Sequence, residues 1–245
     1  MIDPNPKEER VRAFFNRPRG RHTYLEKRFG VDVRACVTRR LLGKVVDSTI
    51  LDVGCGDGTL SLQFAGRGNR LTLVDLSDGM LNAARRNTPC DVLQCCAYLS
   101  LDFLRYEPDR PFDVVLCVGV LAHLQSLDLA IGKLSSLVKS GGRCIIQFTD
   151  PNSWIARLDS LHSSVREAVF GNPYHYSLLE LSYSDVLHSC VRSGFVVAGQ
   201  CRYSLLLPGM GRLPDRLLFR YQLRTLESRW LSRHGSEAIM LLVKK

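Results

Sequence analysis

Three closely spaced glycines are the residues of this sequence best suited to chemistry. Gly54, Gly56 and Gly58 follow the apolar run 49–53 in the segment ILDVGCGDGTL. Glycine lets the backbone turn sharply and approach a ligand closely. In an open parallel sheet, ligands bind at the carboxyl ends of the strands. The segment therefore predicts a site for a nucleotide-like cofactor.

The spacing of these glycines indicates which kind of cofactor binds. The dinucleotide fingerprint GxGxxG would need a glycine where Thr59 stands. Asp57 occupies the place of the pyrophosphate, which its carboxylate would repel. No GK[ST] follows, so a phosphate-binding P-loop is excluded. The pattern favours a phosphate-free cofactor with a ribose, an amino-acid part and a positive sulfonium.

An acid ends the next apolar run, 71–75. Asp75 is placed there to accept hydrogen bonds from ribose hydroxyls. It could instead begin the following helix, but Ser77 is the better residue for that role. A glycine turn followed by an acid at a strand end predicts a nucleoside-bearing cofactor.

Alternating apolar and helical segments must position these residues. Strand–helix alternation at this spacing predicts an α/β fold, with a doubly wound, mostly parallel seven-stranded sheet covered on both faces. The expected strands are 49–53, 71–75, 92–95, 112–118, 143–149, 195–203 and 238–243. The expected helices are 7–16, 31–42, 59–65, 78–87, 126–138, 178–193 and 214–233.

Several of these segments resemble the motifs of one known family. LDVGCGDGTLS is similar to motif I of the class I S-adenosylmethionine-dependent methyltransferases, whose fold is Rossmann-like. VDLSDGMLNAAR, FDVVLCVGVLAHL, LVKSGGRCIIQF and YSLLELSYSDVLHSCVRSGFVV resemble later motifs of that family. The resemblance implies an N-terminal helical arm or lid over 1–45 and a methyltransferase domain over 46–245. Lid insertions are expected at about 152–176 and 204–235.

The resemblance also implies which residues hold S-adenosylmethionine. Asp52 would face the methionine part, Asp75 the ribose hydroxyls and Leu76 the adenine. Family members often carry an acid near the end of the third strand, where this sequence has Cys96, so Ala97 and Tyr98 are expected to supply contacts instead. The implied cofactor residues are Asp52, Gly54, Cys55, Gly56, Asp75, Leu76, Cys96, Ala97, Tyr98, Cys117 and Val118.

Methyl transfer from a sulfonium needs an aligned nucleophile and a dry site more than it needs side-chain chemistry. An oxygen nucleophile usually needs a base, whereas an amine must only be unprotonated. His123 is a candidate base with a suitable intrinsic pKa, or a packing residue under the cofactor. Asp150 could hold or deprotonate the substrate, or form an Asp-Pro turn. His175 in the insertion is a candidate substrate contact or a surface residue.

Two missing motifs and the charge balance restrict the chemical class of the methyl acceptor. No [ND]PP[YF] follows the fourth strand and no Pro-Cys nucleophile is present, which disfavours nucleic-acid bases and protein glutamine. The net charge of +9 favours acidic partners. Arginines recur at 212, 216, 220 and 224, as either a solvated helix face or a surface for an acidic substrate, phospholipid or nucleic acid. Sparse aromatic residues there disfavour single-stranded nucleic acid.

Cysteine usage and hydropathy predict a soluble cytoplasmic protein. The nine cysteines form no CxxC pair and show no zinc spacing, so neither a metal site nor a disulfide framework is expected. The longest apolar run, 114–122, is far shorter than the roughly 20 residues that span a bilayer.

The function predicted from the sequence is S-adenosylmethionine-dependent methylation of an oxygen or nitrogen on a small molecule, in the biosynthesis of a metabolite or natural product. The acceptor can be acidic, and a homodimer is one open oligomeric state. RNA or protein methylation is a second hypothesis. A nicotinamide-dependent oxidoreductase or a non-catalytic cofactor-binding protein is a third.

Overall fold

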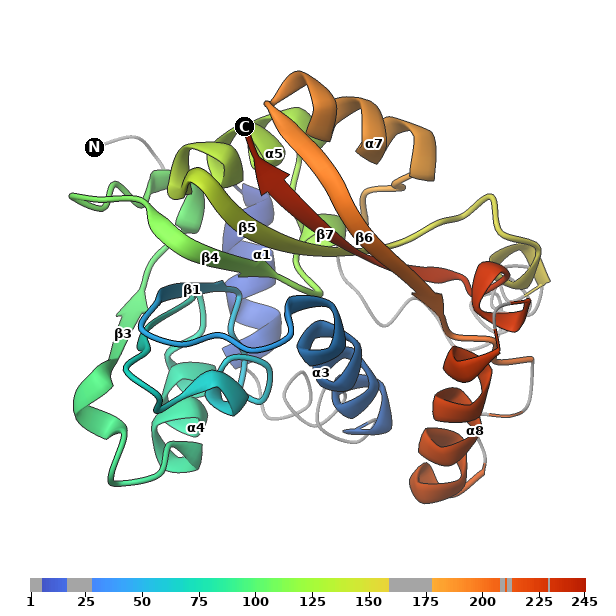
Figure 1. Ribbon diagram of the computed structural model, residues 1–245, viewed down its shortest axis with the longest axis horizontal. Coiled ribbons are helices and arrows are strands. Elements are labelled where there is room, and N and C mark those ends of the chain that lie inside the picture. The colour runs from blue at the N-terminus through green and yellow to red at the C-terminus, as the bar shows by residue number, and fades with distance from the viewer. Residues whose placement is uncertain (1–5, 17–27, 159–177, 208–209, 211–212, 229) are drawn as a thin grey trace.

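A seven-stranded sheet organises the chain (Figure 1). The computed structural model describes residues 6–16, 28–158, 178–207, 210, 213–228 and 230–245. The strand order is β3-β2-β1-β4-β5-β7-β6, and β7 is antiparallel to both of its neighbours while the other pairings are parallel. The strands are β1 (Thr49–Val53), β2 (Arg70–Asp75), β3 (Cys96–Ser100), β4 (Phe112–Cys117), β5 (Val138–Thr149), β6 (Phe195–Tyr203) and β7 (Glu237–Lys244). The predicted fold class is confirmed.

Helices cover both faces of the sheet, and each face has its own core (Figure 1). On one face α5 (Leu127–Leu137) and α7 (Tyr183–Arg192) bury residues such as Leu134 and Val186. On the other face α3 (Arg28–Leu42) and α4 (Asp78–Asn87) do the same. The central strands β1 and β4 are buried along nearly their whole length because both faces are covered.

The remaining helices lie at the N-terminal and late parts of the chain. Helix α1 (Pro6–Asn16) precedes α3, and α8 (Asp215–Glu227) packs against α3. Among the described residues, no helix is both long and apolar enough to cross a bilayer.

Four expected elements are wrong in kind or extent, and one of them is the helix expected over 178–193, which begins only at Tyr183. The helix expected over 59–65 is only a 3₁₀ turn at Leu62–Phe64, because Gly66 and Gly68 adopt left-handed conformations and redirect the chain. The strand expected over 92–95 is a 3₁₀ turn, and pairing with β2 starts at Cys96. The helix expected over 214–233 ends at Glu227, because the backbone of Ser228 is extended.

Candidate functional site

A cavity of about 330 Å³ lies at the carboxyl ends of β1, β2 and β4. This is the edge of a parallel sheet where ligands bind, next to the point where strand order reverses between β1 and β4. It brings together six residues expected from the sequence: Gly54, Gly56, Asp75, Leu76, Val118 and His123.

The glycine turn that ends β1 is held close to β2. The N–H of Gly56 donates to Oδ2 of Asp75 at 2.9 Å, and the N–H of Cys55 donates to the carbonyl of Val74 at 3.0 Å. Gly54 has a φ of 64°, and a Cβ there would lie 2.3 Å from Cγ2 of Val120. A glycine is therefore required at this position both by backbone conformation and by space.

Three carboxylates surround this turn. Asp52 and Asp57 are buried, and burial also raises the pKa of Asp75. Oδ1 of Asp57 accepts hydrogen bonds from the N–H of Thr59 at 3.2 Å and from the hydroxyl of Thr59 at 2.7 Å. We call Asp52, Asp57 and Asp75 the acidic cluster. Its summed charge favours a cationic ligand and opposes a pyrophosphate.

One oxygen of the acidic cluster lacks a partner. Oδ2 of Asp52 is buried and receives no hydrogen bond within the described part of the chain. Burial, followed by the charges of Asp75 and Asp57, raises the pKa of Asp52 to about 7. A buried acceptor without a donor is rare in proteins. A ligand that brings a cationic hydrogen-bond donor, such as an ammonium group, fits this position.

The acid expected after the third strand is present, but at a different position. Asp102 follows β3 and lines the cavity, where its Oδ1 accepts the N–H of Leu104 at 3.0 Å. Leu101, Phe103 and Leu104 line the cavity beside it. The sequence reasoning missed Asp102 because it ended the third strand too early; the apolar run 96–100 followed by an acid was the available signal.

Cys96, Ala97 and Tyr98 do not lie where the sequence placed them. They pair with the first half of β2, at the opposite end of the strand from Asp75. The hydroxyl of Tyr98 bonds that of Thr88 at 2.5 Å, and Arg85 lies over its ring. Their placement as strand-end cofactor contacts is wrong, because pairing with β2 makes them the start of β3.

Helix α1, part of the expected N-terminal arm, supplies part of the cavity wall, although none of its residues was expected in the site. Lys7, Val11 and Phe15 line the cavity. Nζ of Lys7 donates to the carbonyl of Leu124 at 2.7 Å, and Nε of Arg12 donates to that of Leu76 at 3.2 Å. The helix is thereby tied to two loops that border the cavity.

His123 lies in a 3₁₀ turn after β4 and lines the cavity. The ring of Phe15 meets the imidazole edge-on, with centroids 5.7 Å apart. Burial, and then the positive charges of Lys7 and Arg34, lower the pKa of His123 to about 4. The imidazole is therefore neutral near pH 7.

The other expected site residues lie apart from this cavity. The carboxylate of Asp150 pairs with Arg202 and accepts the N–H of Asn152 at 3.1 Å. Cys55 and Cys117 are buried in opposite cores. His175 lies outside the described residues.

The basic stripe expected on the late helix is present in part. Arg216, Arg220 and Arg224 are exposed on α8. The fourth expected member, Arg212, falls outside the described residues.

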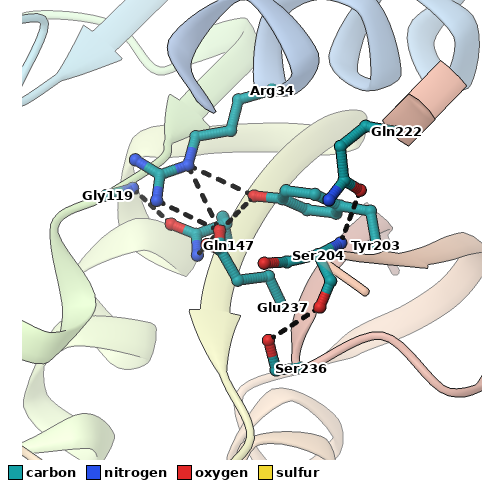
Figure 2. Close-up of polar contacts among 8 residues, drawn as sticks. All are labelled: Arg34, Gly119, Gln147, Tyr203, Ser204, Gln222, Ser236 and Glu237. Carbon is teal, nitrogen blue, oxygen red and sulfur yellow. Dashed lines mark hydrogen bonds and ion pairs between the residues drawn. The ribbon is translucent and has the colours of Figure 1, made fainter. Parts of the chain in front are cut away.

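A polar cluster adjoins the cavity at Gly119 (Figure 2). Oε2 of Glu237 accepts three hydrogen bonds. They come from Nη2 of Arg34 at 3.0 Å, Nε2 of Gln147 at 3.0 Å and the hydroxyl of Tyr203. Oε1 of Gln147 accepts the N–H of Gly119 at 2.8 Å. We call Arg34, Gln147, Tyr203 and Glu237 the Arg34 cluster. It joins α3 to the ends of β5 and β6 and the start of β7.

Comparison with known proteins finds a family model that matches part of the chain. Residues 51–146 match the family described as a methyltransferase domain. A ubiquinone biosynthesis O-methyltransferase from Nitrosomonas europaea is 36% identical over 103 residues, 42% of this chain and 44% of that protein. A demethylmenaquinone methyltransferase from Streptomyces avermitilis is 35% identical over 120 residues, 47% of this chain and 50% of that protein. The chain thus spans about half the length of these curated relatives.

One solved structure resembles nearly the whole chain. It is magnesium protoporphyrin IX methyltransferase from Synechocystis PCC 6803 with bound SAH. The TM-score is 0.68 at 19% identity, covering 98% of this chain and 100% of the other. At that identity the likeness is one of fold.

Proposed function

We propose that this chain, a class I Rossmann-like methyltransferase by its domain match and its fold, transfers a methyl group from S-adenosylmethionine to an oxygen or nitrogen of a small molecule. The observation that carries the proposal is the acidic cluster, with the unpartnered oxygen of Asp52 beside the glycine turn. S-adenosylmethionine carries a sulfonium and an ammonium group but no phosphate. Its charge is the opposite of that of the cluster, whereas a dinucleotide would be repelled.

Different residues of the site would hold different parts of this cofactor. Asp52 and the backbone at Gly54 and Gly56 would hold the methionine end. Asp75 would accept the ribose hydroxyls, since each of its oxygens has a lone pair beyond those used by the N–H groups of Gly56 and Ser77. Leu76 and Asp102 would hold the adenine end, as an apolar contact and a hydrogen-bond acceptor.

The cavity also supplies what methyl transfer needs. When bound, S-adenosylmethionine supplies an electrophilic methyl group with a neutral leaving group. The chain must align the acceptor and exclude water, and α1 lies over the cavity with Val11 and Phe15 facing it. We assign α1, within an N-terminal arm over 1–45, to the role of a lid on the domain over 46–245.

His123 is assigned to orienting the acceptor. A neutral imidazole can accept a hydrogen bond from a hydroxyl or an amine. A pKa of about 4 makes His123 a weak base, so it contributes mainly by aligning the acceptor and not by removing a proton from it. Asp150 is assigned to holding Arg202, whereas the role predicted for His175 stays a prediction.

A small-molecule acceptor in metabolite biosynthesis is supported by the curated relatives, both named as methyltransferases of quinone compounds. The cytoplasm is proposed as the location because all nine cysteines are free thiols, as is usual in a reducing compartment.

Calorimetric titration tests the proposed function. S-adenosylmethionine and S-adenosylhomocysteine are expected to bind the purified chain, whereas NAD is expected to give no heat of binding. Asp75→Asn should weaken both adenosyl ligands, since the ribose loses a charged acceptor. Tight NAD binding without a response to S-adenosylmethionine would overturn the proposal.

A further inference from the structure

The cavity borders the Arg34 cluster at Gly119, whose N–H donates to Gln147. Gly119 lines the cavity and adopts a φ of 78°, and a Cβ on it would lie 3.4 Å from Nη1 of Arg34. Because glycine has no side chain, nothing of residue 119 beyond its backbone separates the guanidinium from the cavity there. A ligand that passes Gly119 therefore meets the Arg34 cluster.

The Arg34 cluster presents one positive and one negative group. Nε and Nη2 of Arg34 both donate to Oε2 of Glu237, at 3.3 and 3.0 Å. Every hydrogen bond to this carboxylate ends on Oε2, which leaves Oε1 without a partner among the described residues. The side chains of Arg34 and Glu237 are 23% and 20% exposed, so the pair is not fully enclosed by the protein.

Stability alone does not account for such a cluster. A partly exposed ion pair usually contributes little to stability. The Arg34 cluster also stands at the edge of the sheet where the parallel strands end, which is the edge that binds ligands. Through the Gly119–Gln147 hydrogen bond it lies beside the ends of β4 and β5.

We propose that the Arg34 cluster is the subsite that anchors the methyl acceptor, and that it selects an uncharged hydroxyl group. The proposal rests on the proposed function. A hydroxyl is both donor and acceptor. It can donate to Oε1 of Glu237 while its oxygen accepts from the guanidinium of Arg34. A carboxylate would be repelled by Glu237 and an ammonium by Arg34, so the acceptor is neutral at this end although the chain as a whole is basic.

Three probes with the same ring system test this selectivity. We would titrate 2-naphthol, 2-naphthoate and 2-naphthylmethylammonium by NMR into the protein saturated with S-adenosylhomocysteine. The wild-type protein is expected to bind 2-naphthol most tightly. Glu237→Gln removes the negative charge beside Arg34, so the preference should shift about tenfold toward 2-naphthoate. Arg34→Met leaves Glu237 uncompensated, and the preference should shift similarly toward the ammonium probe.

The controls separate selectivity from folding. Glu237→Gln is nearly isosteric, and its result suffices if Arg34→Met fails to fold. Arg192→Met removes one partner of the exposed Arg192–Asp128 pair and should leave all three affinities unchanged.

Two results would overturn the anchoring role. One is weaker binding of 2-naphthol than of either charged probe by the wild-type protein, or no binding of it at all. The other is an unchanged preference in Glu237→Gln. Affinity for S-adenosylhomocysteine, measured in every variant, keeps failure of this subsite distinct from failure of the proposed function.

Discussion

The contact between Gly54 and Val120 allows a quantitative test of the cofactor turn. In Gly54→Ala the new Cβ would lie 2.3 Å from Cγ2 of Val120 while the backbone keeps a φ of 64°. The left-handed conformation costs an alanine about 1–2 kcal/mol of folding free energy. Val120 must also leave its rotamer, at about 1 kcal/mol. Because Val120 lines the cavity, its displacement takes space from the cofactor.

The cost in folding free energy and the loss of cavity space appear in different measurements. Denaturant unfolding of Gly54→Ala should show a stability loss of about 2–3 kcal/mol, the sum of the backbone and rotamer terms. Calorimetry should show S-adenosylmethionine bound about tenfold more weakly, which corresponds to about 1.4 kcal/mol.

Two further variants separate the backbone from the cavity. Gly141 has a φ of 74° and open space around its missing Cβ, so Gly141→Ala should lose stability but keep cofactor affinity. Adding Val120→Ala to Gly54→Ala removes the clashing methyl group and should restore affinity, but not the backbone part of the stability. Wild-type affinity in Gly54→Ala, or no restoration in the double variant, would refute the reasoning.

Three further outcomes are expected from the acidic cluster and His123. The pKa of Asp52, raised to about 7, means that a cationic ligand must displace its proton, so affinity for S-adenosylmethionine should rise from pH 6 through 7. Asp52→Asn should abolish that rise in calorimetry. Without ligand, the raised pKa of Asp52 makes the free energy of unfolding fall as pH rises from about 4 to 7. At pH 8 the free energy of unfolding of Asp52→Asn, measured with denaturant, should therefore exceed that of wild type by on the order of 4 kcal/mol. His123→Ala should lower kcat in a methyl-transfer assay with little change in cofactor affinity; an unchanged kcat would leave His123 as a packing partner of Phe15.

The parts of the fold that depend on local pattern could be predicted. The run 49–53, the glycines after it and the start of α4 at Ser77 follow from hydropathy and local conformation. The start of β3 could not, because its register is fixed by pairing with β2 across the intervening helix. A four-residue error in that strand was enough to hide Asp102.

The Arg34 cluster lay beyond sequence reasoning for another reason. Arg34, Tyr203 and Glu237 are separated by up to 203 positions, and only the tertiary fold joins them. No motif marks them, since each is an ordinary member of a helix or strand. The same holds for α1, whose lining residues become part of the site only through its docking over the cavity.

The acidic cluster also bears on how the site clears after each turnover. In the proposed complex Asp52, Asp57 and Asp75 attract the sulfonium charge of the donor. Loss of the methyl group turns that sulfonium into a neutral thioether, so the same carboxylates hold the spent product less strongly than fresh donor. The charges that favour binding of the donor thus lessen product inhibition. The preference for donor over product should be smaller in Asp52→Asn.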